Sequence, residues 1–176
     1  MKKKIIFFDG DGTLWYPKST ERRVKPWWIY DDAVIKNDYL DHLMLDPQAW
    51  ELLLFLKLNY VKAVLLSTVP EIEIAPQQVL TGKIEKMGIS GLLDDYFATE
   101  EYPEAKGEKI LELLDNYGFD HSEAIMVGDS YKWDYQSANE IGVEALLIDC
   151  PYHENRYGDE VINTVNNLGQ IKDFLL

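Results

Sequence analysis

Short apolar runs alternate with amphipathic segments along most of this chain. Three runs are almost wholly apolar and are bounded by charged or turn-forming residues, at positions 4–9, 61–67 and 124–127. Continuous apolarity over this length is typical of a strand that is buried on both faces, as in a parallel sheet. Two further runs, at 96–98 and 144–148, predict additional strands of the same kind.

Segments with apolar residues at helical spacing lie between these runs. Asp46-Pro47 provides a cap and a first-turn proline for a helix that runs to about Tyr60. Glycines follow three further segments of this kind, and the helices predicted there are 76–87, 106–117 and 135–141. The tail from 162 to 176 is expected to be helical in part, with an interruption at Gly169.

Strands that alternate with helices predict an α/β fold. We expect a Rossmann-like three-layer sandwich, in which helices cover both faces of a central, mostly parallel sheet. The chain has 176 residues, of which 47% are apolar, and this is enough for one domain with a continuous core. We therefore expect a single domain over 1–176, with a short flap or mini-cap insert at about 15–45.

The bulk composition excludes several classes of protein. A formal net charge of −14, spread through the chain, argues against binding to a nucleic-acid backbone. No apolar stretch resembles a signal peptide or is long enough to cross a bilayer, so we expect a soluble, cytoplasmic protein without a membrane partner. Cys150 is the single cysteine, which leaves no disulfide framework within one chain. The three histidines lack metal-ligand spacing.

A pair of acidic residues follows the first apolar run. Asp9 and Asp11 are separated by one glycine, and like charges so close together repel each other in a partly dry site. A cation would relieve this repulsion, and Mg²⁺ is the natural candidate because it takes oxygen ligands from one or two carboxylates, waters and phosphates. Asp129 and Asp134, which follow the run at 124–127, could complete the metal site.

Functional side chains are expected to meet at one edge of the sheet. Ligands of open parallel sheets bind beyond the carboxyl ends of the strands, and Asp9, Ser67 and Asp129 stand at or just after such ends. Attack of a carboxylate on a phosphate needs positive charge around the phosphoryl oxygens. Lys106, at the start of its helix, and the metal could provide this charge, while the Ser67 hydroxyl donates a hydrogen bond.

These residue types suit covalent phosphoryl chemistry. Asp9 would form an aspartyl-phosphate, and Asp11 would protonate the leaving oxygen and later deprotonate the hydrolytic water. Structural roles remain open for the other candidates. Ser67 could cap a turn, Lys106 could be a solvated lysine with Lys109 as its nearest competitor, and Asp134 could be a helix N-cap.

Four segments in this order resemble the phosphatases of the haloacid dehalogenase superfamily. Those enzymes carry a DxDGT segment, a strand-end Ser or Thr, a Lys and a GDxxxxD segment. The corresponding residues here are Asp9-Gly10-Asp11-Gly12-Thr13, Ser67 in LLST, Lys106 in EAKGEK, and Gly128-Asp129 through Asp134. The first and last segments are specific, whereas a lone Ser or Lys gains weight only from its order and position.

The resemblance implies both a fold and a set of roles. It implies a fold like that of the haloacid dehalogenases, with Asp9 as nucleophile and Asp11 as general acid/base. Phosphate would be bound by Ser67 and Lys106, and Thr68, where many relatives have Asn, is a further candidate. The Mg²⁺ ligands would be Asp9, the main-chain carbonyl of Asp11 and Asp129, with Asp134 in the outer shell or bound through water. Halide leaves without a proton, so the acid/base at Asp11 favours phosphate-ester hydrolysis over dehalogenation.

The short insert predicts an open site. The resemblance is to small magnesium-dependent phosphatases whose first motif is likewise followed by Leu-Trp, and substrates could be phosphorylated small molecules or phosphoproteins. Cationic and aromatic residues of the insert are candidate substrate contacts, although solvation and local packing compete with that interpretation. These candidates are Trp15, Arg22, Arg23 and Lys25. After the last predicted strand, Tyr152, His153 and Arg156 could also reach the site.

Other functions remain compatible with the same residues. A phosphotransferase or mutase would use the same aspartyl-phosphate but pass the phosphoryl group to an alcohol, which usually requires a larger lid to exclude water. A phospho-accepting signalling domain also combines acids, a hydroxyl and a lysine on a parallel sheet. A catalytically silent binding protein is the third alternative. The sequence leaves the oligomeric state and the physiological substrate open.

Overall fold

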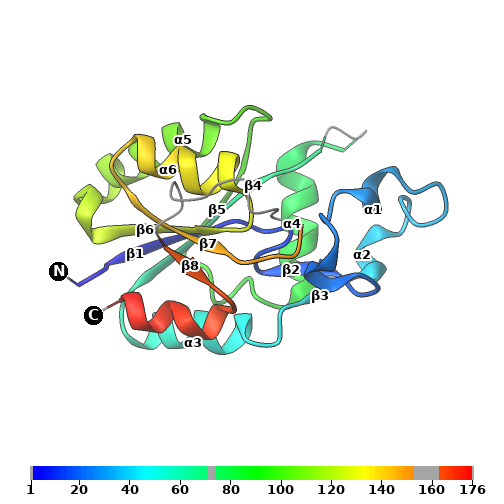
Figure 1. The fold of residues 1–176 in the computed structure, drawn as a ribbon, viewed down its shortest axis with the longest axis horizontal. Coiled ribbons are helices and arrows are strands. Elements are labelled where there is room, and N and C mark those ends of the chain that lie inside the picture. Colours follow the sequence, from blue (N-terminus) through cyan, green and yellow to red (C-terminus); the bar gives the residue numbers. More distant parts are fainter. Residues whose placement is uncertain (1, 71–73, 153–162, 176) are drawn as a thin grey trace.

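The computed structural model describes residues 2–70, 74–152 and 163–175. Its centre is a six-stranded parallel sheet (Figure 1). The order across the sheet is β5-β4-β1-β6-β7-β8, so the first strand lies near the middle. The strands are β1 (Ile5–Phe8), β4 (Lys62–Thr68), β5 (Asp95–Thr99), β6 (Ala124–Gly128), β7 (Glu144–Ile148) and β8 (Thr164–Val165). The predicted α/β fold with a parallel sheet is confirmed.

The central strand β1 is buried on both faces because all of its side chains are apolar. Ile6 and Phe8 belong to one hydrophobic cluster, whereas Ile5 and Phe7 belong to a second cluster. Successive side chains of a strand point to opposite faces, so a strand with no polar alternation contributes to two cores. β1 pairs in parallel with β4 on one side and with β6 on the other.

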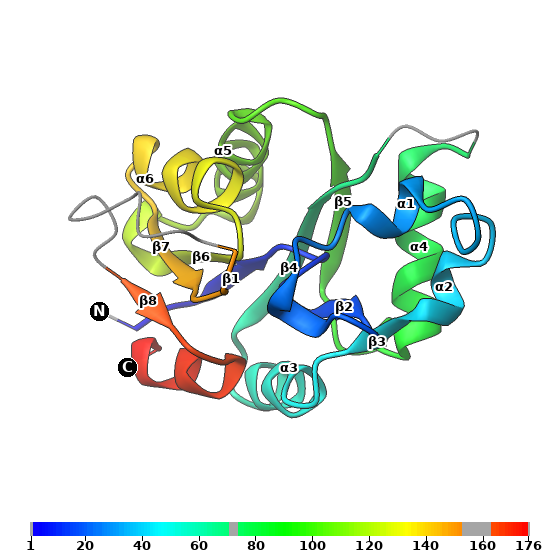
Figure 2. The ribbon, with the colours of Figure 1, turned by 45° about the vertical axis from the view of Figure 1, so that its right-hand side comes forward.

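Helices cover both faces of the sheet, as Figures 1 and 2 show. On the face of Ile5 and Phe7 lie α5 (Ala105–Tyr117), the π-helical turn η3 (Tyr131–Gln136) and α6 (Ser137–Glu140). The opposite face is covered by α3 (Ala49–Leu58), α4 (Pro76–Met87) and the 3₁₀ helix η5 (Leu168–Phe174). A short 3₁₀ turn, η2 (His121–Glu123), precedes β6. Among the described helices, none combines the length and apolarity needed to cross a bilayer.

Most predicted elements are confirmed, and two are corrected. The helix predicted at 76–87 has those bounds, but the one predicted at 135–141 begins earlier, as a π-helical turn from Tyr131. The prediction for the tail was wrong in part, because Thr164–Val165 pairs with β7 as a sixth strand. Gly169 lies inside η5 instead of interrupting it, and its backbone N–H donates to Gln48 Oε1 at 3.0 Å, which fixes the tail against α3.

The insert forms an antiparallel ribbon with short helical turns. Its strands β2 (Trp15–Pro17) and β3 (Leu43–Leu45) pair with each other, and Trp15 lies opposite Leu45. Between them lie η1 (Glu21–Arg23), α1 (Trp28–Asp31) and α2 (Tyr39–His42). The insert lies beside α4 in both ribbon views, and an ion pair joins Lys86 of α4 to Asp41 of α2.

Candidate active site

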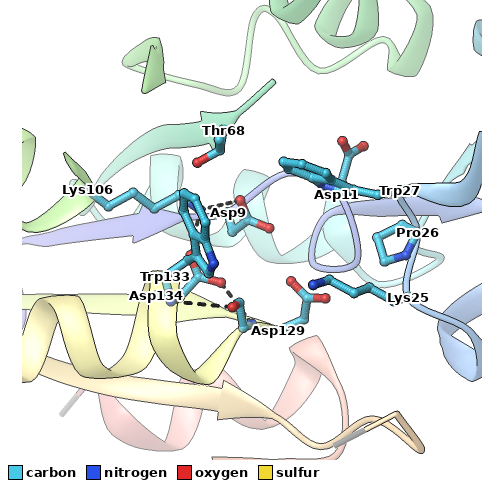
Figure 3. Close-up of a pocket in the computed structure, with 11 residues that line it drawn as sticks. Asp9, Asp11, Lys25, Pro26, Trp27, Thr68, Lys106, Asp129, Trp133 and Asp134 are labelled. Carbon is cyan, nitrogen blue, oxygen red and sulfur yellow. Dashed lines mark hydrogen bonds and ion pairs between the residues drawn. The ribbon is translucent and has the colours of Figure 1, made fainter. Parts of the chain in front are cut away.

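The ends of three neighbouring strands meet at one pocket, which Figure 3 shows from close by. Asp9 follows β1, Thr68 ends β4 and Asp129 follows β6. The parallel sheet brings these ends together, although they are far apart in sequence. The pocket is lined by Asp9, Asp11, Lys25, Pro26, Trp27, Thr68, Lys106, Asp129, Ser130, Trp133 and Asp134.

Lys106 brings a buried positive charge to the pocket. Its Nζ lies 2.5 Å from Asp9 Oδ1 and 2.5 Å from Asp134 Oδ1. Burial disfavours the ammonium, but the two carboxylates outweigh this effect and raise the pKa of Lys106 above its ordinary value. Lys109, the competing lysine, instead pairs with Glu112 on the helix surface.

Three buried carboxylates offer a set of oxygen donors. Asp9, Asp129 and Asp134 each have a carboxylate oxygen within 4.8 Å of the others. Burial raises the pKa of Asp9 well above its ordinary value despite Lys106, and burial together with Asp134 raises the pKa of Asp129 to about 6. One ammonium cannot compensate three anions, so the cluster is suited to a divalent cation that prefers oxygen ligands.

Close packing holds Asp129 against the acidic turn. Its Oδ2 accepts a hydrogen bond from the Tyr152 hydroxyl, a partner whose contribution the sequence left open. Gly12 has a φ of +87°, and a Cβ there would come within 2.3 Å of Asp129 Oδ2. Only glycine fits both the backbone conformation and the space. His153 and Arg156, the other two residues considered after the last strand, lie outside the described residues.

Asp134 lies inside the π-helical turn instead of capping a helix. The N-cap of that turn is Ser130, whose hydroxyl accepts from the Trp133 backbone N–H. Asp134 Oδ2 accepts from the Ser130 backbone N–H at 2.9 Å, while its Oδ1 faces Lys106. A Cβ at Gly128 would come within 2.1 Å of Asp134 Oδ2, so a glycine is needed there too. The π-helical turn therefore places the Asp134 carboxylate close to those of Asp9 and Asp129.

The two candidate hydroxyls at the end of β4 differ in their surroundings. Ser67 is fully buried, and its Oγ has no hydrogen-bond partner among the described residues. Thr68 lines the pocket, and its hydroxyl pairs with that of Thr99 at 3.1 Å. Buried hydroxyls are rarely left unpaired, so Ser67 has unused capacity for a bound acceptor.

Asp11 lies at the pocket but is turned away from Asp9 (Figure 3). Its Oδ1 accepts from Trp15 Nε1 at 2.6 Å. Its Oδ2 accepts from the Tyr30 hydroxyl at 2.7 Å and from Lys83 Nζ at 2.9 Å. Neither Tyr30 nor Lys83 was predicted from the sequence to lie at the site. A signal existed for Lys83, because it falls on the apolar stripe of its helix, between Val79-Leu80 and Ile84.

The insert residues proposed as substrate contacts lie in different places. Lys25 lines the pocket, whereas Trp15 is fully buried and is hydrogen-bonded to Asp11. Arg22 donates to the carbonyls of Gly12 and Thr13 and pairs with Asp46, so it braces the acidic turn from behind.

Two tryptophans line the pocket, whereas Arg23 does not. Arg23 is exposed and bonds to carbonyls at positions 19 and 20 of its own segment. Trp27 and Trp133 also line the pocket, and their indoles lie on two sides of Asp9 in Figure 3. Neither Trp27 nor Trp133 was among the site residues predicted from the sequence.

Known proteins share both sequence and fold with this chain. The chain is 31% identical over 114 residues to a ribulose-1,5-bisphosphate 5-phosphatase of Halopiger xanaduensis, a match that covers 63% of this chain and 45% of the relative. The chain therefore spans less than half the length of that relative. A provisionally named phosphatase from Clostridium difficile has the same fold, with a TM-score of 0.75, 19% identity and full coverage of both chains.

A second solved structure has the same fold, and a family of hydrolases matches most of the chain. A haloacid dehalogenase-like family protein from Streptococcus pneumoniae superposes with a TM-score of 0.69 at 18% identity, over 99% of each chain. The pattern that defines the haloacid dehalogenase-like hydrolases matches residues 19–142 of this chain, which is most of its length. The chain belongs to the haloacid dehalogenase-like hydrolase family, as the order of its four segments indicated.

Proposed function

We propose that this hydrolase is a Mg²⁺-dependent phosphomonoesterase that acts through an aspartyl-phosphate on Asp9. The observation that carries the proposal is the environment of the Asp9 carboxylate. One of its oxygens contacts the Lys106 ammonium, and its neighbours Asp129 and Asp134 complete a buried acidic cluster. A nucleophilic carboxylate next to a fixed cation and a site for a divalent metal has what attack on a phosphate dianion requires.

Phosphoryl transfer would proceed in two steps with balanced proton movement. A free oxygen of Asp9 attacks phosphorus, the bond from phosphorus to the leaving oxygen breaks, and that oxygen takes a proton from Asp11. Water then attacks the acyl phosphate, gives its proton to Asp11, and the bond from phosphorus to the Asp9 oxygen breaks. The products are an alcohol and inorganic phosphate, and the enzyme is regenerated.

The other residues of the pocket would bind and neutralise the phosphoryl group. Asp9, Asp129 and Asp134 would hold Mg²⁺, which when bound supplies positive charge to the phosphoryl oxygens. Lys106 adds a second, fixed charge, and the unpartnered Ser67 hydroxyl can donate to an oxygen of the group. We assign Thr68 a weaker contact, since its hydroxyl also pairs with Thr99.

Three pocket residues around Asp9, which we call the rim, favour a small phosphorylated molecule as substrate. Lys25, Trp27 and Trp133 stand around the nucleophile, and the lysine is exposed and makes no ion pair with the described residues. This cation could meet a second anionic group of a substrate, while the indoles contact its uncharged part. The Halopiger relative is named for a bisphosphate, which fits such a rim. Initial rates on sugar phosphates, nucleotides and a phosphotyrosine peptide would identify the class.

The nucleophile can be identified by chemical trapping. In the Asp11→Asn variant the acyl phosphate should persist, because no base activates water, and borohydride should reduce it to homoserine at position 9. Peptide mass spectrometry after reaction with an aryl phosphate and Mg²⁺ detects this change. Asp9→Asn should show no homoserine and no turnover, with an unchanged circular dichroism spectrum, whereas Asp173→Asn, which alters an exposed acid, should behave as wild type. Turnover by Asp9→Asn would refute the assignment.

A further inference from the structure

Asp11 is held in place by three donors for which the proposed reaction has no other use. Trp15 Nε1 donates a hydrogen bond to its Oδ1, and both the Tyr30 hydroxyl and Lys83 Nζ donate to its Oδ2. Asp11 is 4% exposed, and its carboxylate points away from Asp9 in Figure 3. In this orientation both carboxylate oxygens accept from Trp15, Tyr30 and Lys83, none of which lines the pocket.

Lys83 restrains Asp11, and Asp11 in turn is the counter-ion of the buried Lys83 ammonium. Its side chain is 0% exposed, and Asp11 is its one anionic partner among the described residues. Its Nζ also lies 4.7 Å from the centroid of the Tyr30 ring. A buried ammonium without a counter-ion is strongly disfavoured, so the pair resists separation. Lys83 does not line the pocket, which distinguishes it from a phosphate ligand.

We propose that Lys83 and Tyr30 are positioning residues that hold Asp11 withdrawn from Asp9 until substrate occupies the pocket. The inference rests on the proposed function, in which Asp11 is the acid/base. To serve the leaving oxygen, Asp11 must take up a proton, for which the Lys83 ammonium is the adjacent donor, and it must rotate. Rotation breaks its bonds to Trp15, Tyr30 and Lys83. The restraint therefore lowers the fraction of enzyme with Asp11 in its reactive position.

The same segment of the insert carries both Tyr30 and the rim. Residues 26–30 form one turn, closed by hydrogen bonds from Ile29 N–H to the Pro26 carbonyl and from Tyr30 N–H to the Trp27 carbonyl. Trp27 lines the pocket, so a substrate that presses on its indole acts on Tyr30 through a single helical turn. Contact at the rim is thereby linked to the release of Asp11.

Leaving-group dependence tests the restraint directly. The value of kcat/KM across a series of aryl and alkyl phosphates reports formation of the phosphoenzyme, the step in which the leaving oxygen takes a proton. In Lys83→Met and Tyr30→Phe, substrates with basic leaving groups should react roughly ten- to a hundredfold faster, the usual effect of removing one hydrogen bond to a charged group. Dinitrophenyl phosphate, whose leaving group needs no proton, should be unaffected.

Two matched variants control for changes on the same elements. Tyr39→Phe removes a hydroxyl from the ring that packs edge-on against Tyr30, with centroids 5.2 Å apart. Within the part of the chain that the structure describes, no hydrogen bond joins this hydroxyl to Asp11. Lys86→Met removes the lysine three positions after Lys83 on α4, where it pairs with exposed Asp41. Both should keep the wild-type dependence on the leaving group.

The outcomes separate this inference from the proposed function. Equal changes for all substrates, or slower reaction of those with basic leaving groups, would overturn the restraint. In an Asp11→Asn background, Lys83→Met should not alter the dependence further, because the restrained group is gone. If Asp11→Asn by itself leaves the dependence unchanged, Asp11 is not the acid, and both proposals fail.

A spectroscopic measurement on the wild-type chain covers the case in which Lys83→Met does not fold. The Trp15 indole proton, assigned by comparison with Trp15→Phe, should resonate downfield because it is bonded to Asp11. When beryllium fluoride and Mg²⁺ are added, and ¹⁹F signals show that the fluoride is bound, the resonance should move upfield as Asp11 departs. An unmoved resonance would contradict the proposal.

Discussion

Replacing Asp129 with asparagine is expected to stabilise the metal-free protein while abolishing its activity. Burial and the charge of Asp134 raise the pKa of Asp129 to about 6, from 3.8 in the absence of the fold. At about 1.4 kcal/mol per pKa unit, this difference corresponds to about 3 kcal/mol of destabilisation when the carboxylate is ionised. Asparagine removes the charge and keeps an acceptor for the Tyr152 hydroxyl.

The sign of the effect gives it a characteristic pH dependence. Near pH 4 the folded protein holds the proton, and wild type and variant should be similarly stable. As the pH rises from about 4 to about 6, the unfolded chain releases its proton before the folded one does. The stability of the wild type relative to Asp129→Asn therefore falls across this interval. Above about pH 7 the variant should be more stable by the full amount.

Urea unfolding followed by circular dichroism, in EDTA between pH 4 and pH 8, measures both free energies of unfolding. Asp173→Asn is the control, because it removes an exposed acid of η5 that does not line the pocket. Adding Mg²⁺ should stabilise the wild type but not Asp129→Asn, since a ligand stabilises only the state that binds it. Stability curves that run parallel for wild type and variant would refute the reasoning, because they would show that Asp129 titrates alike in both states.

Three further changes test other parts of the site. Gly12→Ala should reduce turnover by about two orders of magnitude or more, since a Cβ at that positive φ displaces Asp129, and steady-state assays would show it. Lys106→Gln should lower kcat by at least about a hundredfold through loss of a fixed charge; a change confined to KM would argue against this role. Removing metal with EDTA should abolish turnover reversibly, with activity returning on addition of Mg²⁺ but not of K⁺.

Elements with a strong local signal could be predicted from the sequence. The apolar runs of the central strands cannot be solvated without a large loss of free energy, so their burial follows from composition. The helix Pro76–Met87 was bounded by a first-turn proline and a following glycine, and both signals are local. The strand Thr164–Val165 has no such signal, because two residues join the sheet only where β7 presents a free edge.

The positions of the acidic motifs could be predicted from the sequence because each motif follows an apolar run. The sequence by itself therefore determined the parallel sheet, the edge at which Asp9 and Asp129 lie in one pocket, and the type of chemistry expected there. Only the tertiary structure decided which groups surround each carboxylate. Lys83 binds Asp11, which lies 72 positions away in the sequence. Arg22, which was predicted to contact substrate, instead donates to the Gly12 carbonyl of the acidic turn. Such contacts depend on how the insert packs against α4, and packing between distant segments leaves no periodic signal in the chain.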